Sequence, residues 1–193
     1  TQAEELRLMN GAGIAWARSD FDWSGVQPAP GAWTFERLDA VVSNAEHAGV
    51  QMLPILGYGV SFATPAHRHL DLWGAYVRAL AERYGARLPV LEVWNEQNIP
   101  GFWKEPKADD YLPLLKKTYE TVKAVDPTLQ IALGGTAGVP LEYIERLYAL
   151  GGGKAFDIVN VHPYSHPGVP EESLEKRLAD LRAVMSKYGD AAK

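Results

Sequence analysis

The centre of the chain reads Leu88-Pro-Val-Leu-Glu-Val-Trp94-Asn95-Glu96, an apolar run that ends in an aromatic side chain, an amide and a carboxylate. A short apolar run bounded by polar residues is typical of a parallel strand that is buried on both faces. A second run of this kind, from Val50 to Leu56, lies upstream. The two runs predict a parallel sheet with helices packed on it, and the polar end of the central run marks a candidate site.

Helical and strand patterns alternate on both sides of this segment. We expect strands at 13–18, 50–56, 88–94, 129–133 and 156–161, and helices at 2–10, 35–48, 68–84, 107–125, 140–150 and 171–188. This order predicts one α/β domain over residues 1–193, built as a (β/α)8 TIM barrel. Five strand–helix units do not close such a barrel, so we expect strands 2 to 6 with their helices. The open edges are expected to pair with another chain or to belong to a longer polypeptide.

The composition excludes several classes of protein. Hydrophobic residues make up 47% of the 193 residues, which is enough for a packed core. The net charge of −5 argues against a nucleic-acid partner. The chain has no cysteine, so it has no disulfide, thiolate metal site or cysteine nucleophile. No apolar run approaches the ~20 residues of a membrane span.

Polar and aromatic residues follow each predicted strand. In a TIM barrel the chemistry lies at the carboxyl ends of the strands, so these residues are expected to converge on one rim. They are Arg18-Ser-Asp20 with Trp23 just beyond, Gly57-Tyr58, Trp94-Asn95-Glu96, Gly135-Thr136 and His162-Pro-Tyr164.

Glu96 is the strongest catalytic candidate among them. A carboxyl group that follows an apolar strand and a tryptophan is partly desolvated, and desolvation raises a carboxyl pKa. An acid that stays protonated near neutral pH can protonate a leaving-group oxygen. A strand-end carboxylate that caps the next helix or pairs with a nearby cation is the structural alternative.

The segment Trp94-Asn-Glu-Gln-Asn98 resembles the Trp-Asn-Glu-Pro-Asn signature of clan A glycoside hydrolases. Further matches run along essentially the whole chain and are most similar to glycoside hydrolase family 39, which includes β-xylosidases and exopolysaccharide-cleaving enzymes. These matches are Arg18 to Trp23, Pro30-Gly-Ala-Trp33-Thr-Phe35 with Leu38-Asp39, Gly134-Gly-Thr136, and His162-Pro-Tyr-Ser165. The resemblance implies that Glu96 ends barrel strand 4 as the acid/base. Gln97 stands where the family usually has proline, a departure that bears on activity.

The resemblance also implies roles for other residues. Arg18 would reach the nucleophile and hold it ionised, Asn95 would bind the sugar 2-hydroxyl, and His162 and Tyr164 would line the pocket of the sugar that is cleaved. A surface salt bridge for Arg18, a turn-forming role for Asn95 and a satisfied core histidine at His162 are the structural alternatives.

The second carboxyl group of a retaining enzyme, the nucleophile, ends strand 7 in the family, and we expect it to lie outside this sequence. Three carboxyl groups of the chain are the alternatives for this role. Asp157 begins its strand and should lie at the wrong end of the barrel. Glu92 lies one inward layer below Glu96 by strand alternation and is expected to be a buried, paired charge. Asp20 is at the correct rim, but the resemblance gives it no such role.

Aromatic side chains near the strand ends are candidate platforms for sugar stacking. Trp103 is the preferred candidate, because it lies in the loop after Glu96, and Trp23, Tyr58 and Phe102 are further ones. Trp33 is expected to be structural. We expect no metal and no cofactor, since the pair His162 and His166 is separated by prolines and cannot share a helix face.

These observations predict a retaining glycoside hydrolase that cleaves β-linked oligo- or polysaccharides, inactive as this fragment alone. A catalytically silent sugar-binding barrel is the first alternative. A nucleotide-dependent enzyme with a doubly wound sheet is the second, and the sequence disfavours it. Asn10-Gly-Ala-Gly13 precedes a strand instead of following one, and Gly151-Gly-Gly-Lys154 lacks the spacing of a phosphate loop. The resemblance favours an extracellular or periplasmic location and leaves the sugar and the endo or exo mode open.

Overall fold

The computed structural model describes residues 1–165 and 168–193. Five parallel strands form one sheet in the order β1-β2-β3-β4-β5. The strands are β1 (Trp16–Asp22), β2 (Gln51–Gly57), β3 (Val90–Asn95), β4 (Gln130–Ala137) and β5 (Val161–His162). Each strand predicted from the sequence is present, with bounds that differ most in β1 and β5.

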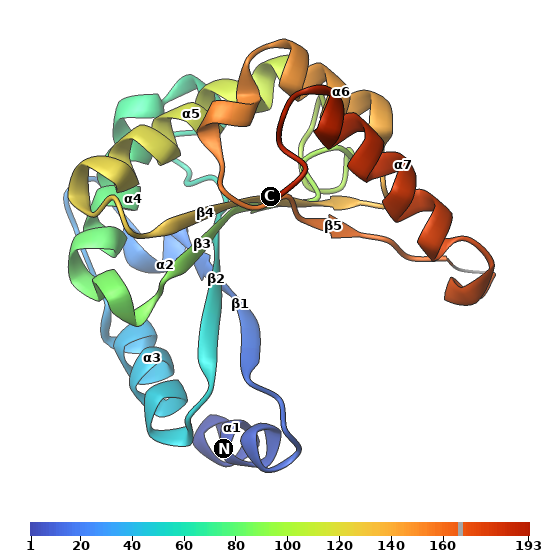
Figure 1. Cartoon of the computed structure of the whole chain (residues 1–193). Helices are drawn as coiled ribbons and strands as arrows, with labels where there is room; N and C mark the ends of the chain where they lie inside the picture. The colour runs from blue at the N-terminus through green and yellow to red at the C-terminus, as the bar shows by residue number, and fades with distance from the viewer. Residues whose placement is uncertain (166–167) are drawn as a thin grey trace.

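Helices connect the strands and cover one side of the curved sheet (Figure 1). They are α1 (Gln2–Gly11), the short α2 (Trp23–Val26), α3 (Glu36–Ala48), α4 (Leu70–Tyr84), α5 (Ala108–Val125), α6 (Leu141–Ala149) and α7 (Leu174–Lys187). Glycine ends α3, because Gly49 takes the left-handed conformation (φ 71°) and its N–H caps the carbonyls of Ala45 and Glu46. No helix in the described ranges combines the length and hydrophobicity that a bilayer crossing needs.

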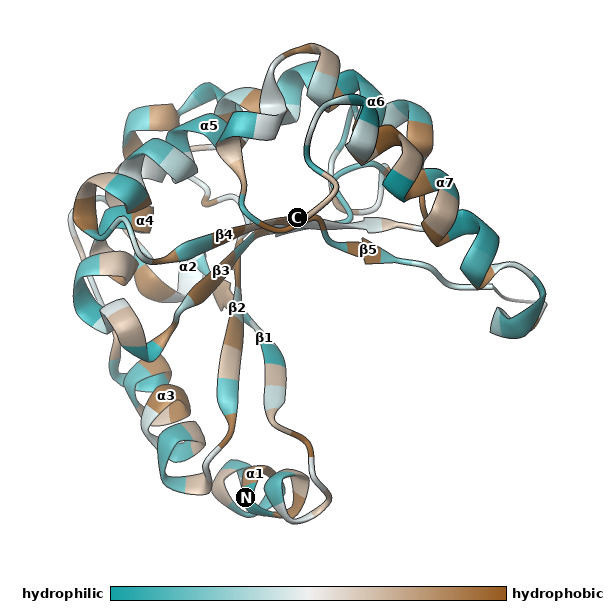
Figure 2. Cartoon of the chain, in the orientation of Figure 1, coloured by the Kyte–Doolittle hydropathy of each residue, from teal (hydrophilic) through white to brown (hydrophobic). Residues whose placement is uncertain are grey.

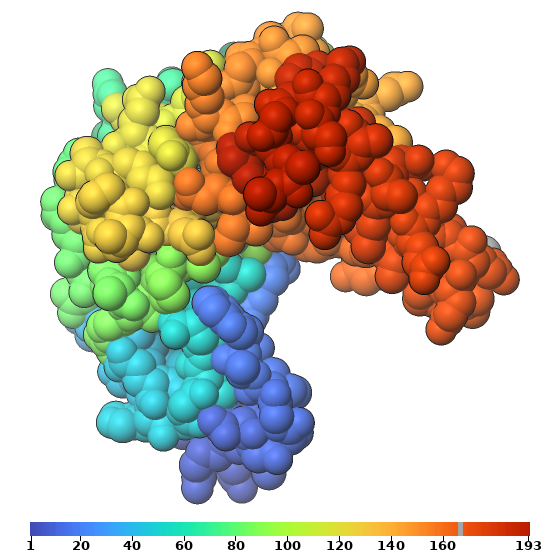
Figure 3. Space-filling model, in the orientation of Figure 1, coloured from blue at the N-terminus to red at the C-terminus, as the bar shows by residue number. Residues whose placement is uncertain are grey.

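The sheet has the strand order of a barrel. Each strand pairs with its neighbour in sequence without a reversal, whereas a doubly wound sheet reverses its strand order at a switch point. The helices lie on the outer side only, and the molecule is an open crescent whose arms are the N-terminal segment and α7 (Figure 3). The predicted α/β class, with five consecutive strands of a TIM barrel, is confirmed, and the doubly wound alternative is wrong.

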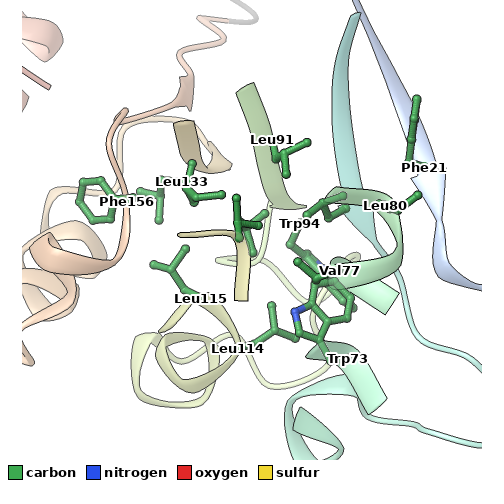
Figure 4. Packing of buried hydrophobic residues seen from close by; sticks show 14 of the residues in the cluster. Phe21, Trp73, Val77, Leu80, Leu91, Trp94, Leu114, Leu115, Leu133 and Phe156 are labelled. Carbon is green, nitrogen blue, oxygen red and sulfur yellow. The ribbon is translucent and has the colours of Figure 1, made fainter. Parts of the chain in front are cut away.

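The hydrophobic core lies between the sheet and the outer helices. Leu91 of β3 and Leu133 of β4 pack toward Leu114 and Leu115 of α5, with Trp73 of α4 beside them (Figure 4). Apolar residues gather in the central part of the sheet, and the helices alternate between apolar and polar residues (Figure 2). Burying each such side chain contributes about 1.5–3 kcal/mol, so this layer holds the strand ends in place.

β1 is longer than the sequence predicted, since it continues through Asp22 in register with Gly57 of β2. The segment Arg18-Ser-Asp-Phe-Asp22 has few strand-forming residues. It forms a strand because its side chains alternate between the core and the concave face of the sheet. Phe21 is buried against Tyr84 of α4, while Arg18, Asp20 and Asp22 alternate to the concave face. These polar residues break the apolar alternation that is typical of a strand, so the sequence did not predict that the strand continues to Asp22.

β5 is shorter than predicted. Phe156 was expected to begin the strand, but it packs in the outer core against Tyr148. Ile158 makes only an isolated bridge to Ala132 before the ladder resumes at Val161. The strand therefore reaches its partner mainly at the rim, where His162 lies.

The open edge beside β1 exposes apolar side chains, among them Ile14 and Trp16. A hollow on the concave side, lined by Trp16, Leu53, Val90 and Ala132, is likewise apolar. Pairing of this edge with another chain, or with more of a longer polypeptide, stays a prediction.

Candidate active site

An ion pair on the concave face fixes the lower layer of the site. Arg18 of β1 donates from Nε to Oε2 of Glu92 at 2.6 Å and from Nη2 to Oε1 at 2.8 Å. Glu92 of β3 is fully buried, and its Oε1 also accepts the backbone N–H of Gly135 at 2.9 Å. The carboxylate of Glu92 raises the pKa of Arg18. The prediction that Glu92 is a buried, paired charge is confirmed.

Asn95 lies directly above this pair. Nη2 of Arg18 also donates to Oδ1 of Asn95 at 2.6 Å, so one guanidinium spans two residues of β3. The bidentate geometry makes this more than the surface salt bridge that the sequence left open for Arg18. Because the side-chain oxygen of Asn95 is occupied, its Nδ2 amide is the end that remains for a ligand.

Glu96 follows at the rim and meets His162 of β5. Its Oε1 lies 3.0 Å from Nδ1 of His162, and its side chain is 15% exposed. The backbone N–H of Glu96 donates to the carbonyl of Gly135 at 2.9 Å. Trp94 and Glu96 have positive φ angles of 74° and 47°, which are uncommon outside glycine and concentrate at functional sites. The end of β3 is therefore held in a conformation that aims Glu96 at His162.

The remaining residues of the Trp-Asn-Glu-Gln-Asn segment anchor the loop that follows. Nε1 of Trp94 donates to the carbonyl of Phe102 at 3.0 Å. Asn98 accepts the N–H of Ala137 at 2.8 Å and donates to its carbonyl at 3.0 Å, which extends the ladder between β3 and β4 through a side chain. In the sequence, Asn98 stands out only as part of the motif, and its hydrogen bonds to Ala137 were not predicted.

Gln97, which stands in place of the family's proline, is fully buried. Its Nε2 donates to the carbonyl of Gly134 at 2.9 Å, a hydrogen bond that proline cannot make. This hydrogen bond ties the residue that follows Glu96 to β4.

Gly135 makes room for His162. A Cβ atom at this position would lie 2.2 Å from Nε2 of His162, and one at Gly134 would lie 2.3 Å from the carbonyl of Val93. The imidazole therefore rests directly on the backbone of β4. The backbone carbonyl of His162 accepts the N–H of Gly138 at 2.9 Å. The close approaches at Gly134 and Gly135 explain why glycine occupies both of these positions in β4.

Tyr58, at the end of β2, faces the carboxylates of β1. Its hydroxyl donates to Oδ1 of Asp20 at 3.2 Å, and burial, together with Asp20, raises the pKa of Tyr58 so that it stays protonated. Burial and the charge of Asp20 also raise the pKa of Asp22 above its ordinary value of 3.8. The rim beside Arg18 therefore offers hydrogen-bond acceptors that suit sugar hydroxyls.

Two predicted stacking platforms are wrong. Trp23 is fully buried, stacks on Tyr76 and donates from Nε1 to Gln27 at 2.9 Å, so it has no face for a sugar. Trp103 is buried with its ring against Trp94, His67 and Tyr111. It supports a wall and offers no platform. In both cases the turn after the strand directs the indole into the outer core.

Two further predictions concern the position of Tyr164 and the absence of a metal site. Tyr164 is exposed at the rim, with its ring centroid 6.1 Å from that of His162, and Arg177 of α7 holds its carbonyl at 3.1 Å. His166 lies outside the described residues. Within the ranges that the structure describes, no group of three or more His, Asp or Glu side chains is placed to hold a metal ion.

Comparison with known proteins bears on the whole chain. The family model described as glycosyl hydrolases family 39 matches residues 63–187, and a model described as beta-galactosidase matches residues 1–65. A β-xylosidase of Geobacillus stearothermophilus is 44% identical over 70 residues, which are 35% of this chain and 14% of that protein. A β-galactosidase of an Arthrobacter species is 27% identical over 157 residues, 64% of this chain and 22% of that protein.

Solved structures agree with this result. A family 39 glycoside hydrolase from Bacteroides cellulosilyticus WH2 superposes with a TM-score of 0.74 at 29% identity over 88% of this chain and 37% of that one. A monomeric β-xylosidase from Caulobacter crescentus CB15 has a TM-score of 0.76 at 21% identity over 99% of this chain and 47% of that one, and supports the fold. The chain therefore spans less than half the length of each of these relatives.

Proposed function

The chain belongs to glycosyl hydrolase family 39, and from this premise we propose that it carries the acid/base part of the active site of a retaining hydrolase for β-linked glycans. The observation that carries the proposal is the position of Glu96. This carboxyl group directly follows β3 at the rim, is 15% exposed and lies 3.0 Å from His162. Below it, Arg18 bonds both Glu92 and Asn95. A carboxyl group that is largely buried but still accessible to a substrate suits proton transfer.

Glu96 acts in both steps of the reaction. In the first, its protonated carboxyl group gives the proton to the glycosidic oxygen while the nucleophile carboxylate bonds to the anomeric carbon and the leaving group departs. In the second, the Glu96 carboxylate takes a proton from water, the water oxygen bonds to the anomeric carbon and the nucleophile is released. Inversion occurs twice, so the sugar keeps its β configuration.

Neighbouring groups orient the reactants. The contact between His162 and Oε1 of Glu96 fixes the carboxyl group. Arg18 occupies the oxygen of Asn95, so the amide Nδ2 is directed to the sugar 2-hydroxyl, whose hydrogen bonds strengthen in the transition state. Tyr164, which is exposed beside His162, lines the same sugar pocket.

We place the nucleophile outside these 193 residues. A retaining pair needs carboxyl groups about 5–5.5 Å apart, and each candidate in the chain has another partner. Glu92 is paired with Arg18. Asp157 pairs with Lys123 at 2.9 Å and accepts the N–H of Ile131, near the start of β4. Asp20 accepts the hydroxyl of Tyr58.

The experiment is hydrolysis of 4-nitrophenyl β-xylosides and β-galactosides by the full-length protein, since relatives carry the names β-xylosidase and β-galactosidase. The first product seen by proton NMR should be the β-anomer of the free sugar. An α-anomer would contradict the retaining mechanism. Sugar binding without release of nitrophenol from any glycoside would favour the silent barrel.

A further inference from the structure

The pairing of β3 with β4 changes just before β3 ends. In the described sheet, the register pairs Val93 with Leu133 and Asn95 with Gly135, and it skips Trp94 and Gly134 between them. Trp94 lies at this point with a φ of 74°, which is left-handed and differs from the extended backbone of a regular strand. Buried backbone groups need hydrogen-bond partners, so those at this break must find them outside the ladder.

Two side chains bind the backbone of Gly134 at the break. The hydroxyl of Tyr111, from α5, donates to the carbonyl of Val93 at 2.7 Å and accepts the N–H of Gly134 at 3.2 Å. On the rim side, Nε2 of Gln97 donates to the carbonyl of Gly134 at 2.9 Å. Both side chains are fully buried. Together they take the place of the backbone bonds that a regular ladder would form.

The bond of Gln97 also fixes the direction of Glu96. The backbone N–H of Glu96 bonds to the carbonyl of Gly135 at 2.9 Å, and the next residue binds the carbonyl of Gly134 through its side chain. The Cα atom of Glu96 therefore lies between two anchors on adjacent residues of β4. Because the backbone sets the direction of a side chain, these anchors keep the carboxyl group of Glu96 beside His162.

The packing around Gln97 leaves little room for another arrangement. A Cβ atom at Gly134 would clash with Oε1 of Gln97, so the amide lies directly on the backbone of β4. Among the described residues, Oε1 has no hydrogen-bond partner. The bond from Nε2 is thus the polar contact that an apolar side chain of similar length would remove, and this makes its contribution measurable.

We propose that Gln97, supported by Tyr111, is a positioning residue that holds Glu96 in the orientation for proton transfer. The inference rests on the proposed function of Glu96. It adds the means by which this chain, with glutamine where its family usually has proline, fixes that residue. Gln97 and Tyr111 are fully buried, so they act through the backbone of Glu96 and not on the substrate. Their effect should appear in the steps that need the proton of Glu96.

The test compares leaving groups in the full-length enzyme, with aryl β-glycosides of the sugar that wild type accepts. A dinitrophenolate departs with little help from an acid, whereas a methoxyphenolate needs a proton. Gln97→Met removes the hydrogen bond and keeps the length of the side chain. It should lower kcat/KM about tenfold for the methoxyphenyl glycoside and less than about twofold for the dinitrophenyl glycoside. Tyr111→Phe, the second variant, should show the same selective loss.

The matched control is Gln27→Met. Gln27 is likewise buried and accepts the indole N–H of Trp23 at 2.9 Å, but it lies in the turn that follows α2. The control should leave the ratio of the two kcat/KM values as in wild type, even if it lowers the melting temperature as much as Gln97→Met does.

Glu96→Gln provides the reference, because it removes the acid itself and should change this ratio more than Gln97→Met does. If Glu96→Gln shows the selective loss, then equal losses for both glycosides in Gln97→Met and Tyr111→Phe, or no loss for either, would overturn the inference and leave the role of Glu96 standing. An unchanged ratio in Glu96→Gln, or no hydrolysis of any aryl glycoside by wild type, would remove both proposals.

Discussion

Glu92 lies inside β3 and Glu96 lies just after its end, and the two carboxyl groups have opposite surroundings. Glu92 lies in the closed layer beneath the rim, fully buried, with both oxygens bonded to Arg18 and one also to Gly135. Glu96 lies at the rim, 15% exposed, and among the described residues its carboxyl group pairs with His162. A saturated carboxylate holds structure, whereas a sparsely bonded one is available for proton transfer.

The two environments predict different roles for the two glutamates. The closed layer orders the rim from below, because Arg18 bonded to Glu92 also reaches Asn95. The rim in turn has positive φ angles at Trp94 and Glu96, a strained arrangement that the surrounding contacts must maintain. Substitutions in the two regions should therefore separate stability from turnover.

The largest effect is expected at Glu96. Glu96→Gln keeps the shape but cannot supply a proton, so kcat of the full-length enzyme should fall about 10²–10⁴-fold. The urea midpoint should stay near that of wild type, since only the contact with His162 is altered. Glu142→Gln, an exposed change on α6, is the matched control for kcat. A large loss of stability in Glu96→Gln would erase the distinction.

Glu92 should give the opposite result. Glu92→Gln leaves the partly exposed guanidinium of Arg18 without its charged partner, and loss of hydrogen bonds between charged groups costs about 1.5–3 kcal/mol of unfolding free energy. Urea unfolding of the full-length protein measures this. Glu46→Gln, which removes the exposed partner of Arg87, should cost much less. Equal losses for the two variants would contradict the structural role of Glu92.

Gly135 joins the two regions, since its N–H bonds to Glu92 and its Cα supports His162. Gly135→Ala places a methyl group into the imidazole and should cost about 1–3 kcal/mol through overpacking, with a parallel loss of kcat as His162 is displaced. Gly101→Ala adds a methyl group where nothing lies within 4 Å and should behave as wild type. Normal activity of Gly135→Ala would show that His162 does not orient Glu96.

The smallest effect is expected at Asp22. Its pKa is raised above 3.8 by burial and by Asp20, so the native state binds more protons than the unfolded state just above that pH. Stability is therefore lost as pH rises through this window. Asp22→Asn should raise the melting temperature at pH 7, with a gain that shrinks toward pH 4. A gain of equal size at both pH values would contradict the electrostatic origin.

Periodicity and glycine stops predicted the fold well, because apolar runs such as 50–56 and a left-handed Gly49 have few alternatives. They ended the first strand too early. Arg18, Asp20 and Asp22 face a polar interior, and charged residues weaken the signal of a strand even where the ladder continues to Gly57. Sequence pattern and structure therefore disagree most on the polar concave face of the sheet.

Residues at the carboxyl ends of strands were predicted correctly to lie together. The positions of side chains in the loops were not predicted correctly. Arg18, Asn95, Glu96 and His162 converge because parallel strands present their carboxyl ends together. The buried positions of Trp23 and Trp103 depend on which way a loop turns, and no spacing in the sequence encodes that direction. A hollow lined by Tyr58 and Phe102 forms between the loops that follow β2 and β3, so the sequence showed these side chains only as isolated aromatic residues.

The role of Glu96 is tested most directly by azide rescue of Glu96→Ala in the full-length protein. With a dinitrophenyl β-glycoside of the sugar that wild type accepts, the first step needs little acid help, and the covalent intermediate then waits for a base that is absent. Azide needs no base to attack. We predict that azide restores turnover and yields the β-glycosyl azide. Unchanged slow hydrolysis, or an α-glycosyl azide, would contradict the assignment of Glu96 as acid/base.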